Sequence, residues 1–314
     1  MNLYIDEYNG KISINGNKLI LKKDDEIRTF QIGNIESITI NKNVQITSQA
    51  ICKLSQENIS ISWFSSNQMI CQTCGLKNIF RLKQQFDLFN NDNLRLQFAK
   101  KNIKSKICNQ MFFIKKQEQF NNQDIKKSHS IESLLGIEGT YAAFYFSEFK
   151  KNFSDIYNFS ARKKHPPADP VNSVLSFSYA LLYNRITSVI NLHGLNPSIG
   201  FFHSLKNNHY ALSSDLMESL RCDVCDSIAV DLFSELTGSD EFTKTDNGVI
   251  LSKRIKQYII GKFYHNLNKE VPTENGFSDD FNGVINQIVC SYIKALETHN
   301  IADFKPYMAG EKYV

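Results

Sequence analysis

The sequence predicts a two-domain α+β protein, with a small β-sheet domain at residues 1–86 and a larger all-α helical bundle at residues 94–314. Two observations lead to this fold class. The first part consists of short apolar and Thr-rich runs separated by turn-forming pairs such as Asn-Gly and Asp-Asp, which is typical of strands joined by hairpins. The later part carries apolar residues at helical spacing. A chain of 314 residues is long enough for two cores.

In the first part, five short runs have the composition of strands: NLYIDEY, GKISING, NKLILKK, RTFQIGN and ESITINK. A helix interrupts them at SQAICKLSQ, where Ile51 and Leu54 recur at helical spacing, and ISISWFSS then returns to a strand. No catalytic residue types gather here, so we expect a scaffold or dimerisation domain. The polar end of FDLFNNDN, residues 86–93, predicts a linker.

In the second part, LRLQFAKKNIKSKICNQMFFIKKQEQF predicts an amphipathic helix with a basic side. Asp169 suits the N-cap of the next long apolar helix, Pro170 its first turn, and Gly194 the position after its end. A further helix is predicted from Asp215 to Leu236, followed by KRIKQYIIGKFYHNL and FNGVINQIVCSYIKALE. Residues 302–314 are expected to form a surface extension.

The composition, with 42% hydrophobic and 22% charged residues, is that of a soluble globular protein. The opening MNLYIDEYNG lacks a signal peptide, and no apolar run reaches the length of a membrane span, so we expect a cytoplasmic protein. The net charge is only +4, but residues 93–127 contain nine Lys or Arg against two acids. Such a run suits a polyanionic partner, and a solvated helix face is its commoner explanation.

Four of the seven cysteines form two pairs, Cys71 with Cys74 and Cys222 with Cys225. The pairs lie far apart compared with the spacing in zinc ribbons, and the second falls within a predicted helix. We therefore expect reduced thiols and no zinc site.

The stretch GLNPSIGFFHSLKNNHYALSSDLMESL, residues 194–220, gathers residue types that carry chemistry. It supplies His203 from a loop, and then Asp215 and Glu218, whose spacing places both on one helix face. Far upstream, Glu138 lies on a mostly apolar stripe, where a lone acid needs a partner. Carboxylates and an imidazole can hold one divalent ion and leave positions open for water and phosphate.

A different interpretation of the same stretch is structural. Asp215 can be the N-cap and Glu218 the third residue of a capping box, and His203 is then a packed core histidine. Spacing alone leaves both interpretations open.

Four motifs together resemble one family, the CRISPR-associated adaptation integrases and endonucleases (Cas-one). They are GIEGTYAAFYF around Glu138, PPADPVNSVLSFSYALL at 166–182, GLNPSIGFFH at 194–203 and LSSDLMESLR at 212–221. Weaker likeness extends over IGNIESITINKNVQITSQAICKLSQENISISWF. The resemblance covers nearly the whole chain.

The resemblance implies that Glu138, His203 and Glu218 are ligands of Mg²⁺ or Mn²⁺, with Asp215 as an auxiliary catalytic acid that either orients a ligand or binds a second ion. Lys206 falls where a basic residue in some members approaches DNA phosphate, and Tyr183 matches a tyrosine near the active site of some members. Basic residues that suit DNA contact, by composition alone, are Arg162, Lys163, Lys164, Lys100, Lys101 and Lys104.

The resemblance further implies a homodimer that acts with a small partner, Cas-two. Its function would be metal-dependent joining of the 3′-hydroxyl ends of a prespacer duplex into a CRISPR repeat array. Two other functions remain compatible with the residues: a stand-alone DNA endonuclease or branched-DNA resolvase, and a non-catalytic DNA-binding scaffold.

Overall fold

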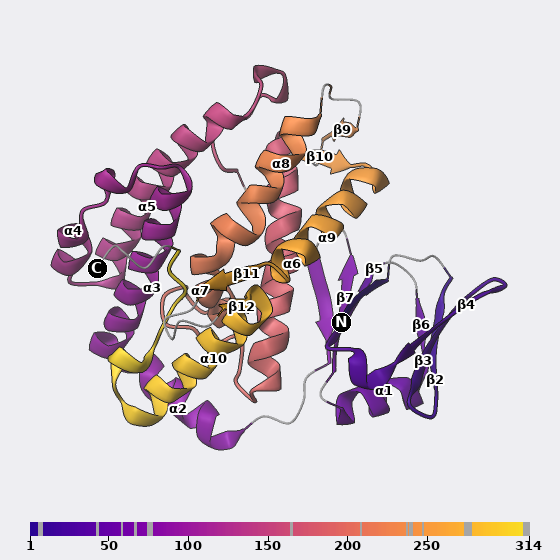
Figure 1. Ribbon diagram of the computed structural model, residues 1–314. Coiled ribbons are helices and arrows are strands. Elements are labelled where there is room, and N and C mark those ends of the chain that lie inside the picture. The colour runs from indigo at the N-terminus through magenta and orange to yellow at the C-terminus, as the bar shows by residue number, and fades with distance from the viewer. Residues whose placement is uncertain are drawn as a thin grey trace. The chain divides into compact units, whose positions relative to one another are not determined.

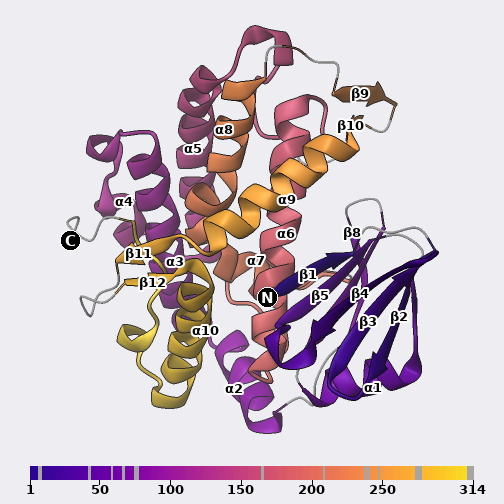
Figure 2. The same ribbon diagram turned by 45° about the vertical axis from the view of Figure 1, so that its right-hand side comes forward.

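The computed structural model describes residues 1–5, 9–41, 44–57, 59–65, 68–73, 78–163, 166–207, 209–236, 238, 241–246, 248–272 and 278–309. They form two compact units, each visible in Figures 1 and 2. The first comprises residues 1–83 with 184–197, and the second comprises residues 84–183 with the chain from Ser198 onward. The predicted fold class, a small β-sheet region followed by a mostly helical one, is confirmed.

The first unit contains two four-stranded sheets and one helix. The strands of one sheet, in spatial order, are β1 (Asn2–Ile5), β5 (Ser37–Asn41), β7 (Ser60–Ser65) and β8 (Gln68–Gln72). Those of the other are β4 (Glu26–Gln31), β3 (Lys18–Lys23), β2 (Lys11–Asn15) and β6 (Gln45–Ile46). Helix α1 (Ser48–Gln56) begins where Thr47 accepts a hydrogen bond from the N–H of Ala50. Ile and Leu side chains from both sheets and α1 form one core.

The end of the long helix α6 (Pro170–Leu192) also belongs to the first unit, although our prediction placed residues 184–197 in the helical domain. Side-chain contacts explain the difference. Ser188 accepts hydrogen bonds from Ser60 (2.8 Å) and Gln72 (3.3 Å), and Arg185 forms an ion pair with Glu36 (2.9 Å). One continuous helix therefore contributes residues up to Tyr183 to the second unit and the rest to the first.

The second unit is a helical bundle with two short hairpins (Figures 1 and 2). Besides the first part of α6, its helices are the end of α2 (Ile79–Phe89), α3 (Asp92–Phe113), α4 (Asn122–Lys127), α5 (Ile131–Phe149), α7 (Ala211–Met217), α8 (Ser227–Glu235), α9 (Lys253–Leu267) and α10 (Phe281–Thr298). The hairpins are β9 (Phe242–Thr245) with β10 (Gly248–Leu251), and β11 (Glu270–Pro272) with β12 (Ser278–Asp280).

Capping and periodicity explain the helices that build the site. Asn91 caps α3 through the N–H of Leu94, and Ser130 caps α5 within a capping box. Helix α3 buries Ile103, Ile107 and Met111 of the predicted apolar stripe, and it also buries Phe98. It lies beside α5 in both views (Figures 1 and 2), which brings the basic helix next to the helix that carries Glu138.

The predicted linker at residues 86–93 is wrong, because α2 continues to Phe89. Leu88 is buried, and Gln85 donates a hydrogen bond to the carbonyl of Ile199 (3.2 Å). Tertiary contacts thus keep this polar stretch helical. Among the described residues, no helix combines the length and the apolar character needed to cross a membrane.

The predicted surface extension at the C-terminus is wrong for its described part. Phe304 is fully buried and stacks on Phe98, with ring centroids 5.1 Å apart. The N–H of Ala309 donates to the side chain of Asn109 (2.8 Å). Residues 310–314 lie outside the described chain.

The structure differs from the predicted helix Asp215–Leu236 in where the helix starts and in its middle part. Helix α7 already begins at Ala211, and a 3₁₀ turn (Glu218–Leu220) and a π-helical segment (Cys222–Asp226) separate it from α8. A π segment inserts an extra residue into the turn, so it redirects the side chains that follow it, and such segments are frequent at functional sites.

One residue of the π segment gives a stability prediction. Burial raises the pKa of the Asp223 carboxyl to about 6, although a hydrogen bond from Tyr307 opposes the shift. Between pH 4 and pH 6 the folded chain therefore binds more protons than the unfolded chain, and stability falls as the pH rises. We expect Asp223→Asn to raise the free energy of unfolding by about 1 kcal/mol at pH 7 and to bring no gain near pH 4.

Thermal unfolding of the variant across this pH range checks the expectation. Asp87→Asn, at an exposed carboxyl of α2, is the control. A gain of equal size at both pH values would contradict the assigned cause.

Candidate functional site

Asp215 is fully buried, and four contacts hold its carboxylate. Its Oδ2 accepts hydrogen bonds from the N–H groups of Phe201 (2.7 Å) and Phe202 (3.0 Å). Its Oδ1 accepts the N–H of His203 (2.9 Å) and lies 2.7 Å from the His203 ring Nδ1. The capping-box interpretation is wrong, because α7 begins four residues before Asp215 and Tyr210 occupies the N-cap without a side-chain cap.

Gly200 permits this arrangement. A Cβ at this position would lie 2.4 Å from Asp215 Oδ2 and within 3 Å of the backbone of Ala211 and Leu212. The glycine of the GLNPSIG motif is therefore required by close approach of the loop to α7.

The Asp215 contact orients the His203 imidazole. Because a carboxylate accepts hydrogen bonds, a neutral His203 ring carries its proton on Nδ1, and its Nε2 then has a free lone pair. This Nε2 lies 3.9 Å from Glu218 Oε1. The histidine is thus held as a potential ligand that faces Glu218, rather than packed as a core side chain.

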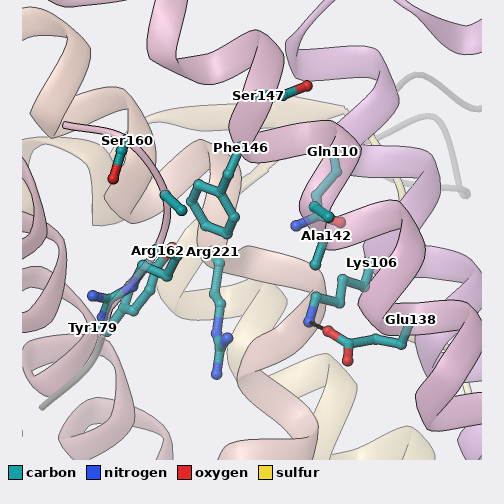
Figure 3. Close-up of a pocket in the computed structure, with 12 residues that line it drawn as sticks. Lys106, Gln110, Glu138, Ala142, Phe146, Ser147, Ser160, Arg162, Tyr179 and Arg221 are labelled. Carbon is teal, nitrogen blue, oxygen red and sulfur yellow. Dashed lines mark hydrogen bonds and ion pairs between the residues drawn. The ribbon is translucent and has the colours of Figure 1, made fainter.

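Lys106, from α3, lies between the two predicted glutamate ligands. Its Nζ is 2.5 Å from Glu138 Oε1 and 2.7 Å from Glu218 Oε2, and Figure 3 shows the contact with Glu138. The other oxygen of Glu218 forms an ion pair with Arg221 (2.9 Å). Glu138, Glu218 and His203, remote in sequence, therefore converge on one place within the helical unit.

Both sides of this ion pair are strongly biased toward their charged forms. Burial alone would lower the pKa of Lys106, but Glu218 and Glu138 outweigh it and the pKa is raised. Burial alone would raise the pKa of Glu218, but Arg221, Lys106 and His203 outweigh it and the pKa falls to about 2. The site is charged at neutral pH and its two glutamates are balanced by Lys106 and Arg221.

The backbone that carries Asp215 and Glu218 is fixed by amides of α3. Asn102 donates to the carbonyl of Asp215 (2.7 Å), and Asn109 donates to the carbonyl of Ser219 (2.6 Å). Asn102, Lys106 and Asn109 follow one another at helical spacing on the buried side of α3. This buried polar stripe is the sequence signal that could have indicated a role for Lys106 in the site. From the sequence, we counted Lys106 only among the nine basic residues of 93–127.

The π segment adds a buried carboxylate behind the site. Asp226 accepts hydrogen bonds from the hydroxyls of Tyr145 (2.7 Å) and Tyr179 (2.6 Å). Burial raises the pKa of Asp226, and the two hydroxyls oppose that shift. The Tyr179 ring lies under the guanidinium groups of Arg221 (5.0 Å) and Arg162 (5.2 Å). Arg221 is therefore held between Glu218 and an aromatic ring that Asp226 fixes.

The residues predicted to contact DNA have different surroundings. Lys206 is exposed after His203, and Lys163 is exposed as well, whereas Lys164 lies outside the described residues. The hydroxyl of Tyr183 accepts the N–H of Tyr210 (2.7 Å), and burial raises its pKa to about 12. Tyr183 therefore supports the start of α7.

The remaining predicted basic residues are partly committed to the fold. Lys100 donates to the carbonyl of Lys126 (3.0 Å), and Lys101 donates to the carbonyls of Ile301 and Ala302 (3.1 and 3.2 Å). Lys104 is half-buried on the same helix. Arg162 donates to the side chains of Asn172 (2.9 Å) and Ser176 (3.1 Å).

The residues present fit a divalent cation in their chemistry. Two carboxylates and one imidazole nitrogen are a hard, mixed donor set. The carboxylates of Glu138 and Glu218 already share one cation, the Lys106 ammonium. Among the described residues, no three His, Cys, Asp or Glu side chains are spaced to hold a metal ion directly.

The predicted cysteine pairs differ in their surroundings. Cys222 and Cys225 are buried in the π segment, and burial raises both thiol pKa values. Cys71 is exposed in the β unit, and its predicted companion Cys74 lies outside the described residues.

Comparison with known proteins identifies the family. The model of the family "CRISPR associated protein Cas1" matches residues 3–265. The chain belongs to the Cas1 family. The Cas-one resemblance of the four motifs is thereby confirmed.

Two curated relatives of the Cas1 family illustrate its range. A CRISPR-associated exonuclease Cas4/endonuclease Cas1 fusion of Leptospira interrogans is 31% identical over 280 residues, which cover 80% of this chain and 52% of the fusion. A CRISPR-associated endonuclease Cas1 of Thermodesulfovibrio yellowstonii is 30% identical over 83% of this chain and 88% of that protein. The chain thus spans about half of the first relative and most of the second.

Solved structures share the fold. A CAS1 protein from Thermotoga maritima superposes with a TM-score of 0.83 at 20% identity, over 95% of this chain and 97% of that one. A casposase bound to its integration product gives 0.84 at 24% identity, over 99% and 93%. The Cas6-RT-Cas1–Cas2 complex gives 0.84 at 20% identity, over 98% of this chain and 36% of that one.

The Asp215 contact gives a prediction for the glycine beneath it. We expect Gly200→Ala to lower the free energy of unfolding by about 2 kcal/mol or more, because the added Cβ meets a fixed carboxylate and backbone. Gly136→Ala is the matched control, since a Cβ there meets nothing within 4 Å, and we expect a gain of up to about 1 kcal/mol from helix propensity. Denaturant unfolding of both variants measures the difference, and equal effects would contradict the role of close approach.

Proposed function

We propose that this chain is the catalytic subunit of a CRISPR adaptation integrase, which joins the 3′-hydroxyl ends of a prespacer duplex to a CRISPR repeat in double-stranded DNA. The observation that carries the proposal is the convergence of Glu138, Glu218 and His203 Nε2 around the Lys106 ammonium. Family membership supports it, and the solved structures of similar fold include a Cas2-containing complex and a casposase bound to its integration product.

In this proposal, Glu138, Glu218 and His203 would hold Mg²⁺ or Mn²⁺ in place of the Lys106 ammonium. The bound ion supplies Lewis-acid polarisation of the reacting phosphate and stabilises charge on its oxygens. Asp215 fixes the tautomer and orientation of His203, and therefore acts as a positioning residue whose oxygens are already used. Arg221 keeps Glu218 ionised and oriented.

The reaction exchanges one phosphodiester bond for another. The 3′-hydroxyl of the incoming DNA loses its proton to water as its oxygen attacks a phosphorus of the repeat. The existing bond from that phosphorus to a 3′-oxygen breaks, and the leaving oxygen takes up a proton from water. The nucleophile belongs to DNA, so no serine or cysteine nucleophile is required. We assign phosphate contacts outside the metal site to Lys206 and Lys163, whose side chains are exposed.

We further propose that the β unit provides the homodimer contact and that Cas2 is the partner of the dimer, in the cytoplasm. The related proteins described as endonucleases favour a second candidate, DNA cleavage or branched-DNA resolution at the same site with water as the nucleophile. A non-catalytic scaffold is disfavoured, because Asp215 does not cap a helix and Glu218 faces His203.

The products of one reaction distinguish these functions. An end-labelled prespacer-like duplex is incubated with a repeat-containing plasmid, the Cas2 partner and Mg²⁺ or Mn²⁺. Labelled plasmid supports the integrase, cleaved DNA without joining supports the endonuclease or resolvase, and unchanged DNA with retained binding supports the scaffold.

Substitutions of the three proposed ligands test the site. We expect Glu138→Gln, Glu218→Gln and His203→Ala each to lower the rate of joining by at least about 100-fold, because each removes a ligand. Glutamine keeps the shape of the glutamates while removing the charge. Glu132→Gln, at an exposed glutamate of α5, is the control and keeps the wild-type rate. A ligand variant with half the wild-type rate or more would refute the assignment.

Lys106 gives a prediction with a readout other than activity. Lys106→Met leaves Glu138 and Glu218 without their shared cation, and loss of one partner from a buried ion pair costs about 3–5 kcal/mol. We expect the variant to unfold at a lower temperature without metal and to gain more from Mn²⁺ than the wild type, because no ammonium competes with the ion. Thermal unfolding against Mn²⁺ concentration measures the gain. Lys104→Met, from the same helix, should respond like wild type, and an unchanged Mn²⁺ response of Lys106→Met would rule out competition.

A further inference from the structure

The last described part of the chain, residues 301–309, packs along α3 within the helical unit, and we call it the C-terminal strap. It follows α10 and begins with a 3₁₀ turn (Ile301–Asp303) that contacts α3 (Figure 1, yellow). Regular structure ends there, yet Phe304 is fully buried and Ala309 is 9% exposed. Because a buried irregular segment must satisfy its backbone groups through contacts with other elements, the partners of the strap indicate what it supports.

Asn109 of α3 joins the strap to the turn that carries Glu218. Its side chain is 1% exposed. The Nδ2 group donates to the carbonyls of Ser219 (2.6 Å) and Tyr307 (3.0 Å), and Oδ1 accepts the N–H of Ala309 (2.8 Å). Only one orientation of the amide satisfies these contacts, because the reversed amide would place its oxygen against two carbonyls. The strap therefore fixes the orientation in which Asn109 holds the residue next to Glu218.

Phe304 supports the other half of the proposed metal site. Its ring stacks on Phe98 and meets the Phe201 ring edge-on, with ring centroids 5.1 and 5.7 Å apart. Phe201 is fully buried, and its N–H donates to the Asp215 carboxylate, which orients His203. Aromatic pairs in these geometries are stabilising beyond the area that they bury. A single ring thus separates the strap from the N–H that holds Asp215.

Tyr307 attaches the strap at three further points. Its hydroxyl donates to the carboxyl of Asp223 in the π segment. Its carbonyl accepts the hydroxyl of Ser105, which lies one helical turn before Asn109 on α3. Its ring packs against Phe281 of α10, with centroids 5.3 Å apart. The strap is therefore attached to elements that precede and follow Glu218 in space and in sequence.

We propose that the C-terminal strap positions the proposed metal ligands. It acts through Asn109 on the turn of Glu218, and through Phe304 on the loop of His203. Neither Asn109 nor Phe304 is placed to touch the reacting atoms, so both are positioning residues. The inference rests on the proposed function only where it calls these side chains metal ligands, because the coupling is a property of the chain without metal or DNA.

Hydrogen exchange of the full chain, without metal or DNA, tests the coupling. Phe304→Leu keeps an apolar side chain but loses the ring pairs. We expect the N–H groups of residues 199–204 to exchange at least about tenfold faster than in the wild type, with α8 unchanged. Asp303→Asn, which removes the ion pair of the strap with Lys294 on α10 (3.0 Å), is the matched control and keeps wild-type exchange. Unchanged exchange of 199–204 in Phe304→Leu, or equal acceleration in α8, overturns the proposal.

Metal binding provides the second arm. Asn109→Leu keeps the size of the side chain without its hydrogen bonds, and Asn109→Ser is a milder change in case the first variant does not fold. We expect at least about tenfold weaker binding of Mn²⁺, measured without DNA by the electron paramagnetic resonance signal of the free ion. Ser291→Ala is the control, because it removes a contact between the strap and α10 (3.0 Å to the N–H of Lys305) and none at the site.

Glu218→Gln in the same titration separates the two claims. Weaker Mn²⁺ binding in Glu218→Gln, with wild-type binding in both Asn109 variants, leaves the metal site standing and overturns the role of the strap. Faster exchange of 199–204 in Phe304→Leu, with wild-type Mn²⁺ binding in Glu218→Gln, supports the coupling and removes the metal-ligand assignment.

Discussion

The carboxylate of Asp215 holds the loop that carries His203, and the rest of the site depends on that attachment. A fully buried carboxylate is costly unless hydrogen bonds surround it, and here three backbone N–H groups and an imidazole do so. The same contact orients the histidine and joins the loop to α7. This attachment requires a glycine at position 200, because the loop passes too close to α7 there for any side chain.

A second constraint is the alternation of charge behind that loop. Glu138, Lys106, Glu218 and Arg221 follow one another with opposite signs at ion-pair distance. Two neighbouring glutamates would repel each other without a cation, and Lys106 supplies that cation in the folded chain. In the proposed function, a divalent ion would therefore replace the ammonium rather than enter a preformed gap.

The π segment (Cys222–Asp226) supports the side chains of the ion pairs and is not proposed to take part in the reaction. Asp226 fixes two tyrosine hydroxyls, and the Tyr179 ring supports the guanidinium of Arg221. A cavity beside Glu138 is lined by the same Tyr179 and by Arg162 and Arg221. The proposed metal site and this cavity therefore share supporting residues.

Much of the architecture followed from local patterns. Alternating strands with Asn-Gly turns, the capping residue Asp169 and the apolar stripe of α3 all act over a few residues, so the sequence by itself determined the fold class and most helices. The start of α7, the continuation of α2 to Phe89 and the π segment depend on long-range contacts, and propensity did not reveal them. For the site, the family motifs singled out Glu138, His203, Asp215 and Glu218, but only the tertiary structure decided that Lys106 joins the two glutamates and that Asp215 is occupied by backbone N–H groups. The physical reason is that contacts between separate elements, such as Lys106 with Glu138 and Glu218, leave no periodic signal along the chain.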